Sequence, residues 1–273
     1  MDIQRKCEIL KQANVNLRKM FPKGPLPLIK MRDIEAVYDR SVLGFSVDAK
    51  TKKGLGRGYL TGIMYLAPYK LSGINMCPMA SKGCAAACLF TAGRGAFRSI
   101  TRQRVIKTLA YHFDTPRFVD AIKKSIRSLI VKAKNKGLTP VVRLNGTSDI
   151  LWERNTDIIQ SFPDIQFYDY TKIAQRFLMP VPANYHLTLS LSESNDSDAR
   201  LALAKGHNVA AVFRKDIPAR LFGFDVINGD DTDLRFLDRR GVVVGLKAKG
   251  KAKHDASGFV RETGDTDTES EAA

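Results

Sequence analysis

Three cysteines, Cys77, Cys84 and Cys88, lie within twelve residues in the pattern C-x6-C-x3-C. Three thiolates on one short loop can hold three irons of a [4Fe–4S] cluster and leave the fourth iron open to a ligand. Zinc is the alternative ion, but it needs a fourth ligand, such as Cys7 or a histidine, and the paired C-x2-C spacing typical of zinc sites is absent. A third alternative is a loop of small buried side chains without metal. The spacing favours the iron–sulfur cluster.

The elements that must position this loop can be read from short apolar segments. The segments predicted as β-strands are 59–66, 141–144, 165–168, 186–191, 208–213, 224–227 and 242–246. The stretches predicted as helices are 3–17, 96–113, 117–136, 149–161 and 196–205. Strands that alternate with helices indicate an α/β fold with a parallel sheet. We expect a partial or complete (β/α) barrel, and the alternative is a doubly wound open sheet.

Polar residues follow several of the predicted strands, where the chemistry of parallel α/β folds collects. The candidates for binding a cofactor are Asn145, Thr147, Ser148, Asp149, Asp169 and Lys172. The cysteine loop itself follows the first predicted strand of this series. We therefore expect these side chains and the cysteines to meet at one edge of the sheet.

The chain divides into three parts by composition. Residues 1–58 read as a basic N-terminal extension, 59–260 as the barrel-like domain with the cysteine loop 77–88, and 261–273 as an acidic, disordered tail. No apolar run approaches the ~18 residues of a transmembrane helix, and the first residues lack an apolar signal core. We expect no membrane association and a cytoplasmic protein.

The charge is concentrated in one half of the chain. The formal net charge is +16, and residues 61–139 hold 14 basic and two acidic residues. Such asymmetry predicts a surface that binds nucleic acid, and the alternative is an ordinary solvated basic face. Arg94, Arg98 and Arg102 would form one stripe if a helix began by Arg94, and Lys247 and Lys249 alternate after the last strand. These five residues are the nucleic-acid candidates.

A group of acidic residues, Asp230, Asp231 and Asp233, surrounds a predicted turn. Carboxylates in such a group can hold Mg²⁺ for phosphoryl chemistry, as in a metal-dependent nuclease. The sequence Asn-Gly-Asp-Asp is also an ordinary turn, and that interpretation is favoured.

The order of strand, three-cysteine loop, helix and successive βα units resembles the radical S-adenosylmethionine (SAM) enzymes. That resemblance implies a partial barrel, a cluster on Cys77, Cys84 and Cys88, and SAM bound to the open iron. The usual spacing of those enzymes, C-x3-C-x2-C, differs from the spacing here. The runs 77–98, 143–150, 168–172 and 244–250 also resemble a family of uncharacterised bacteriophage proteins. This second resemblance covers about residues 60–260 and implies a phage protein in the host cytoplasm, with no activity attached.

Three functional hypotheses result. The leading one is a phage iron–sulfur enzyme, radical-SAM-like, that acts on a nucleic acid or nucleotide. The second is a nucleic-acid-binding or host-regulating module whose iron–sulfur or zinc site is structural. The third is the metal-dependent nuclease.

Overall fold

The computed structural model describes residues 1–46 and 49–263, without the side chains of Ala49, Lys50 and Arg94. Its α-helices are α1 (Ile3–Met20), α2 (Met31–Glu35), α3 (Ala49–Lys53), α4 (Lys82–Ala86), α5 (Arg98–Phe113), α6 (Thr115–Lys134), α7 (Trp152–Asn155) and α8 (Asp196–Ala204). Its strands are β1 (Gly44–Phe45), β2 (Tyr59–Ile63), β3 (Thr139–Arg143), β4 (Gln166–Thr171), β5 (Tyr185–Ser190), β6 (Asn208–Phe213), β7 (Arg220–Leu221), β8 (Phe224–Asn228), β9 (Val243–Lys247) and β10 (Val260–Arg261). Short 3₁₀ helices are η1 (Leu55–Arg57), η2 (Leu89–Thr91), η3 (Gly93–Ala96), η4 (Ala174–Leu178), η5 (Arg235–Leu237) and η6 (Gly250–His254).

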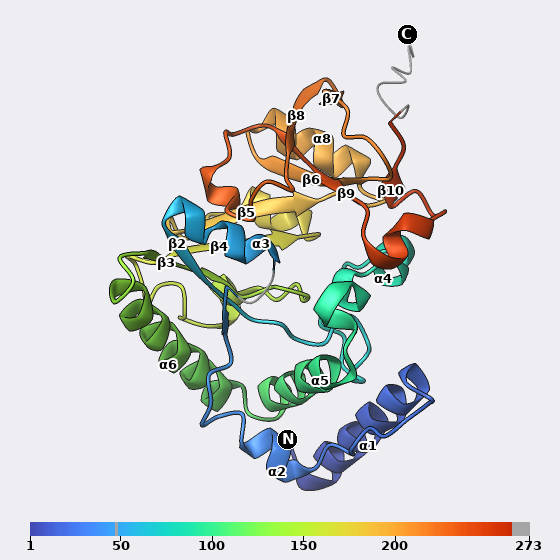
Figure 1. Cartoon of the computed structure of the whole chain (residues 1–273), viewed down its shortest axis with the longest axis vertical. Coiled ribbons are helices and arrows are strands. Elements are labelled where there is room, and N and C mark those ends of the chain that lie inside the picture. The colour runs from blue at the N-terminus through green and yellow to red at the C-terminus, as the bar shows by residue number, and fades with distance from the viewer. Residues whose placement is uncertain (47–48, 264–273) are drawn as a thin grey trace.

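The strands form one mixed sheet in the order β1-β2-β3-β4-β5-β6-β9-β8-β7, and β10 pairs with β6 (Figure 1). The pairs from β2 to β6, and on to β9 and β8, are parallel, which confirms the predicted parallel α/β class. The sheet is not closed, so the expectation of a complete barrel is wrong. Antiparallel β1 borders β2, and the antiparallel β7–β8 hairpin forms the other edge. Consecutive strands are neighbours from β2 to β6, without the reversal of strand order that a doubly wound sheet contains.

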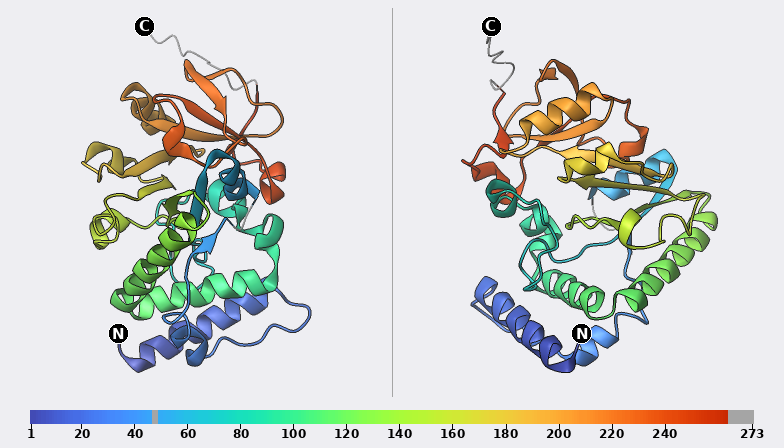
Figure 2. Two further views of the ribbon diagram at one scale, coloured as in Figure 1. Left: turned by 60° about the vertical axis from the view of Figure 1, so that its left-hand side comes forward. Right: turned by 180° about the vertical axis from the view of Figure 1, so that it is seen from behind.

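Helices cover the outer face of the sheet. The approach of α6 to β2 is close: a Cβ placed on Gly62 would lie 2.7 Å from a methyl carbon of Leu129. Helices α1 and α2 lie beyond α5, on the side away from the sheet (Figures 1 and 2). Ala13 and Leu17 of α1 share one buried cluster with residues of β2 and β3. The basic N-terminal residues therefore contribute to the main core.

The opposite face of the sheet is filled by the segment around η5. The ring of Phe236 packs edge-on against Tyr59, with centroids 5.4 Å apart, and against Tyr168 at 5.5 Å. Leu234 is buried with Val141 and Tyr168 in the same cluster. This segment therefore packs on the face of the sheet that carries Tyr59, Val141 and Tyr168.

Predicted and observed elements agree for all seven strands and for the helices α1, α5, α6 and α8. The helix predicted over 149–161 is mostly wrong, because only Trp152–Asn155 is α-helical. The side chain of Asn145 bonds to the backbone of Ile150 and to the indole of Trp152, which holds 145–152 as a loop. Of the predicted acidic tail, residues 264–273 lie outside the described part of the chain. Across residues 1–46 and 49–263, no helix combines the length and apolar character needed to span a bilayer.

Candidate functional site

The cysteine loop follows β2 and lies against the carboxyl ends of the parallel strands. The Cys77 thiol donates to the carbonyl of Thr147, just after β3, at 3.6 Å. The amide of Asp149 donates to the carbonyl of Met76 at 2.8 Å. The loop is therefore attached to the segment that follows β3.

A second attachment joins the loop to the end of β5. The carboxylate of Glu193 accepts hydrogen bonds from the backbone N–H of Gly83 and from the Ser81 hydroxyl, both at 2.7 Å. Burial acts to raise the pKa of Glu193, but these two hydrogen bonds outweigh it, and the pKa is lowered. Ser81 also caps α4 by accepting from the amide of Cys84. The first turn of α4 is thus held by a side chain from the opposite half of the sheet.

The chain's last described segment covers the same turn. A Cβ on Gly83 would lie 2.0 Å from the Ser257 hydroxyl and 2.7 Å from the Cβ of Phe259, so only glycine fits without a shift. Strand β10 follows, pairing with β6 at Val212 and Phe213, beyond the point where β5 pairs with β6. Arg261 of β10 is ion-paired with Asp196.

The three cysteines carry free, half-buried thiols. Burial raises the pKa of Cys77 to about 12, and the neighbouring Cys88, Asp149 and Cys84 add to the effect. Burial also raises the pKa of Cys88, with a further contribution from Cys84 and opposing contributions from Arg104 and Lys172. Helix α4 ends at Ala86, so Cys84 and Cys88 do not share one helix. The thiols are close enough to influence one another's charge.

The described residues contain no preformed site for a single metal ion. Within residues 1–46 and 49–263, no three His, Cys, Asp or Glu side chains lie close enough together to hold one metal ion. A closed zinc site requires four ligands around one atom, at about 2.0–2.3 Å. A cluster takes one thiolate on each of three separate irons and spaces its ligands more widely. Cys7, on α1, is exposed and forms no disulfide in the described chain.

Asn145, Thr147 and Ser148 lie beside the cysteine loop, and their side chains are used within the protein. The amide oxygen of Asn145 accepts from the Ser148 hydroxyl at 2.9 Å, and the Thr147 hydroxyl donates to the carbonyl of Leu66 at 2.5 Å. Asn145 is 2% exposed and is saturated by the loop 145–152. These side chains shape the strand-end loop, and the backbone carbonyl of Thr147 faces Cys77.

Asp149 and Asp169 belong to a buried network that sequence reasoning did not anticipate. Arg176, 1% exposed, forms a bidentate pair with Glu153 and also contacts Asp149 at 3.4 Å. Its third partner is the Tyr185 hydroxyl, which donates in turn to Asp169 at 2.8 Å. Burial raises the pKa of Asp169 to about 7, although several hydrogen bonds and Arg143 oppose the shift. Burial likewise raises the pKa of Asp149.

Two cations lie beside Cys88. Lys172 follows β4, and its amine lies over the ring of Phe259 at 5.3 Å. Arg104, on α5, is 7% exposed and donates only to the carbonyl of Phe90 among the hydrogen bonds of the described residues. Burial lowers the pKa of Arg104, and the Cys88 thiol opposes this. Nothing in the sequence distinguishes Arg104 from the other arginines of the same helix.

The helix that would carry the predicted arginine stripe begins later than the stripe requires. Helix α5 begins at Arg98, so Arg94 precedes it, and the side chain of Arg94 lies outside what the structure describes. Arg98 lies over the ring of Phe21 at 5.7 Å. Arg102 is bound to the carbonyls of Pro27 and Leu28 and ion-paired with Asp33 at 2.8 Å. Arg102 therefore fastens the N-terminal segment to α5.

The other nucleic-acid candidates lie next to the predicted acidic group. Lys249 is ion-paired with Asp230 at 2.7 Å, and the backbone N–H of Lys247 donates to the same carboxylate. Asp231 accepts from the side chain of Asn228, whereas Asp233 is buried and paired with Arg143 at 2.8 Å. The three carboxylates thus have different partners and form no metal site in the described chain.

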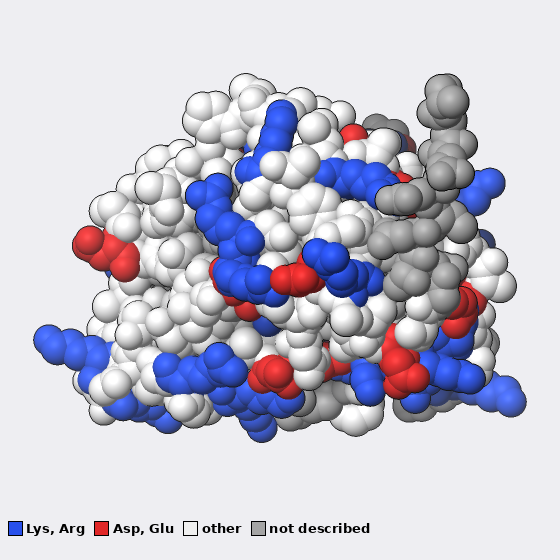
Figure 3. All heavy atoms as spheres, turned by 90° about the horizontal axis from the view of Figure 1, so that it is seen from above, with Lys and Arg blue, Asp and Glu red and all other residues white. Residues whose placement is uncertain are grey.

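Charge is mixed over the end of the molecule that carries β7 and β8. Figure 3 shows Lys and Arg interspersed there with Asp and Glu among uncharged residues. The sequence agrees, since residues 140–246 hold 12 basic and 14 acidic residues. The basic excess belongs to the other parts of the molecule.

Comparison with curated proteins found no match, and neither did comparison with solved structures. A model of the family described as Gene product 88 matches residues 42–263. The match supports the resemblance to a family of uncharacterised phage proteins, whereas no comparison supports a resemblance to radical SAM enzymes. Because the match covers most of the chain, the protein belongs to the Gene product 88 family.

Proposed function

We propose that this protein is an iron–sulfur enzyme, radical-SAM-like, that acts on a nucleic acid or nucleotide. Cys77, Cys84 and Cys88 are the proposed ligands of a [4Fe–4S] cluster with one open iron. The observation that carries the proposal is the position of the three thiols, on one loop at the carboxyl ends of a parallel sheet wound in sequential order. Active sites of parallel α/β folds lie at this edge.

The chain's own residues have definable roles in this proposal. Glu193 and Ser81 fix the first turn of α4, and the backbone of Thr147 and Asp149 fixes Cys77. Three thiolates and a bound cluster carry net negative charge in a half-buried place, which must be offset. Lys172 and Arg104 are the cations near Cys88 that can do so.

Substrate and cofactor binding fall to the strand-end loops. When bound, the cluster would supply the electron that cleaves a carbon–sulfur bond of SAM. Asn145, Ser148, Asp149, Asp169 and Lys172 are the proposed positioning residues for SAM. For Asn145, Ser148, Asp149 and Asp169 this role is indirect, because all four side chains are buried and bonded within the protein.

A second candidate function is a nucleic-acid-binding or host-regulating module in which the cluster, or zinc, is structural. The charge of +16 favours it, because a basic surface needs no open iron to bind a polyanion. The nuclease has less support, because Asp233 is committed to Arg143 and Asp230 to Lys249.

The test is anaerobic purification followed by iron and sulfide analysis and by electron paramagnetic resonance of the reduced protein with and without SAM. We expect about four irons per chain and a spectrum that changes when SAM is added. Cys77→Ser, Cys84→Ser and Cys88→Ser should each lose iron, while Cys7→Ser, on exposed α1, should retain it. A cluster insensitive to SAM would support the binding module instead, and zinc or no metal would overturn the enzyme proposal.

A further inference from the structure

The exposed side of α6 and its C-terminal extension carry an unbroken basic surface. A shallow hollow there is lined by the cations Lys124, Arg127, Lys132 and Lys136, with Ser128, Val131 and Asn135 between them. These positions recur at intervals of three and four residues, so they share one side of the helix. We call Lys124, Arg127, Lys132 and Lys136, with Ser128 and Asn135, the α6 basic face.

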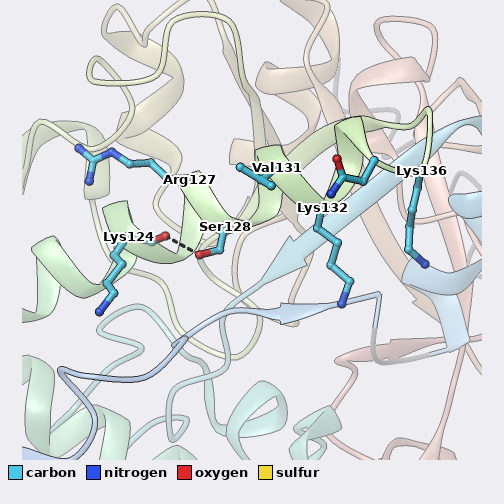
Figure 4. A pocket seen from close by; sticks show the side chains of 7 residues that line it. Lys124, Arg127, Ser128, Val131, Lys132 and Lys136 are labelled. Atoms are coloured by element: carbon cyan, nitrogen blue, oxygen red, sulfur yellow. Dashed lines mark hydrogen bonds between the residues drawn. The ribbon is translucent and has the colours of Figure 1, made fainter.

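The cations of this face have no acidic partners within the described chain. The neighbouring Lys123 is paired with Asp157 at 2.7 Å, but no carboxylate among residues 1–46 and 49–263 forms an ion pair with the four cations. Lys124 and Arg127 are three residues apart in α6, so these like charges are neighbours on the surface of the helix. Figure 4 shows Lys124, Lys132 and Lys136 extending in one direction from α6, and Arg127 away from them. Such an arrangement has an electrostatic cost that a polyanion would offset.

A second basic segment adjoins the C-terminal end of α6. The backbone N–H of Thr139 donates to the carbonyl of Gly58 at 2.8 Å, so the glycine-rich loop before β2 lies beside the turn that follows Lys136. Lys52 of α3 and Arg57 of η1, in the segment before β2, are exposed. The basic surface therefore continues beyond the helix.

We propose that the α6 basic face binds the phosphate backbone of a nucleic-acid duplex. From Lys124 to the helix end at Lys134 the rise amounts to about 15 Å. Phosphates of one strand follow one another every ~3.4 Å along a duplex, so this length matches about four nucleotides. Ser128 and Asn135 add hydrogen-bond donors of the kind that contact phosphates.

A membrane surface fits this face less well. Helices that bind anionic lipid present a large apolar side to the bilayer. The apolar side of α6, including Phe118, Ile122, Ile126 and Leu129, is buried in the core. Val131 is the one apolar residue that lines the hollow.

The position of the face gives it a recruiting role. Lys136 precedes β3, whereas Cys77 contacts Thr147 beyond the other end of that strand. The five residues of β3 span about 16 Å. A duplex on α6 is therefore held away from the cysteines. The inference deepens the nucleic-acid part of the proposed function and does not depend on the cluster.

The test compares two variants with equal loss of charge. Lys124→Gln, Arg127→Gln, Lys132→Gln and Lys136→Gln are combined in one protein. The matched control combines Lys11→Gln, Arg18→Gln, Lys19→Gln and Lys23→Gln, four exposed residues in and after α1. Binding of a labelled 25-base-pair DNA duplex, an RNA duplex, single-stranded DNA and phosphatidylserine vesicles is measured over a series of salt concentrations.

We expect the wild type to bind duplex with a steep salt dependence. Loss of four phosphate contacts should make the negative slope of log K against log salt less steep by about 3.6. For each doubling of the salt concentration, the affinity of the wild type should then fall by a factor about 12 times larger than that of the α6 variant. The α1 variant should keep the wild-type slope. A protein with Lys124→Arg, Lys132→Arg and Lys136→Arg should also bind, and thermal unfolding should show all variants folded.

Several results would overturn the inference. They are an equal or larger loss in the α1 variant, absence of duplex binding by the wild type, or binding to vesicles alone. Iron content is measured on the same preparations. A protein that binds duplex without iron would contradict the proposed enzyme and support the α6 basic face as a duplex-binding site. A protein that contains iron but binds no duplex would contradict this inference and leave the proposed enzyme unaffected.

Discussion

The carboxylate of Glu193, at the end of β5, accepts the backbone N–H of Gly83 at 2.7 Å, although 110 residues separate the two in the chain. Through this contact the sheet holds the first turn of α4, and with it Cys84. The cysteine loop is short and rich in alanine, so its position depends on such anchors. The first prediction follows from this contact.

Glu193→Ala should loosen the cysteine loop. It leaves the N–H of Gly83 and the hydroxyl of Ser81 without their acceptor, at a cost of about 1–3 kcal/mol in the free energy of unfolding. We expect lower iron retention than in wild type, with Glu193→Gln intermediate because its amide oxygen can still accept. Glu8→Ala, at an exposed pair with Arg5, is the control. Equal iron retention in Glu193→Ala and Glu8→Ala would contradict the anchoring role.

Gly83→Ala should displace the segment that covers α4. The new methyl group would overlap the Ser257 hydroxyl and the Cβ of Phe259, and overpacking of this kind costs about 1–3 kcal/mol. Hydrogen exchange should become faster at residues 255–261. Gly56→Ala is the matched control, since no atom lies within 4 Å of its added Cβ. Unchanged exchange in Gly83→Ala would show that the segment does not rest on α4.

Arg176→Met should destabilise the whole domain. It leaves Glu153 and Asp149 buried without their shared counter-charge, and removal of one partner from a buried pair costs about 3–5 kcal/mol. Arg154→Met, the same substitution at an exposed position in α7, should cost no more than about 0.5 kcal/mol. Urea unfolding of both variants measures the difference, and similar midpoints would refute the importance of the network.

Asp169→Asn should change how stability depends on pH. The folded-state pKa of Asp169 is about 7, above its ordinary value of 3.8, so the folded protein holds this proton more tightly than the unfolded chain. Its contribution to the free energy of unfolding therefore falls as pH rises from about 4 to about 7, and is level above that. The asparagine variant lacks this titration. Relative to wild type it should gain on the order of a few kcal/mol between pH 4.5 and pH 8. Parallel stability curves would rule out the raised pKa.

Periodicity in the sequence predicted the parallel strands because buried strands such as β9 are short apolar runs bounded by polar residues. It could not predict β10 or β1, two-residue strands whose pairing depends on distant backbone. The sequence also did not predict that the sheet stays open, because closure depends on how the edge strands pair. The composition of the strands does not predict how the edge strands pair.

The candidate site was predicted in part for a similar reason. The spacing of the three cysteines is local and visible, whereas the anchors Glu193 and Arg176 come from other strands and helices. Asn145 was expected to face a ligand because it follows a strand. Its side chain instead forms hydrogen bonds to Ile150 and Trp152 in the loop after β3. Polar type and position after a strand place these residues at the carboxyl edge of the sheet. They do not show which of the side chains form hydrogen bonds within the protein.

The covering of α4 by residues 255–261 has a consequence during synthesis. The three cysteines leave the ribosome about 170 residues before the segment that packs on Gly83. Until then the nascent chain exposes three thiols on a loop that lacks both Glu193 and its cover. The loop acquires these contacts only after residues 255–261 have been translated, so the final arrangement of the three thiols also forms only after that point.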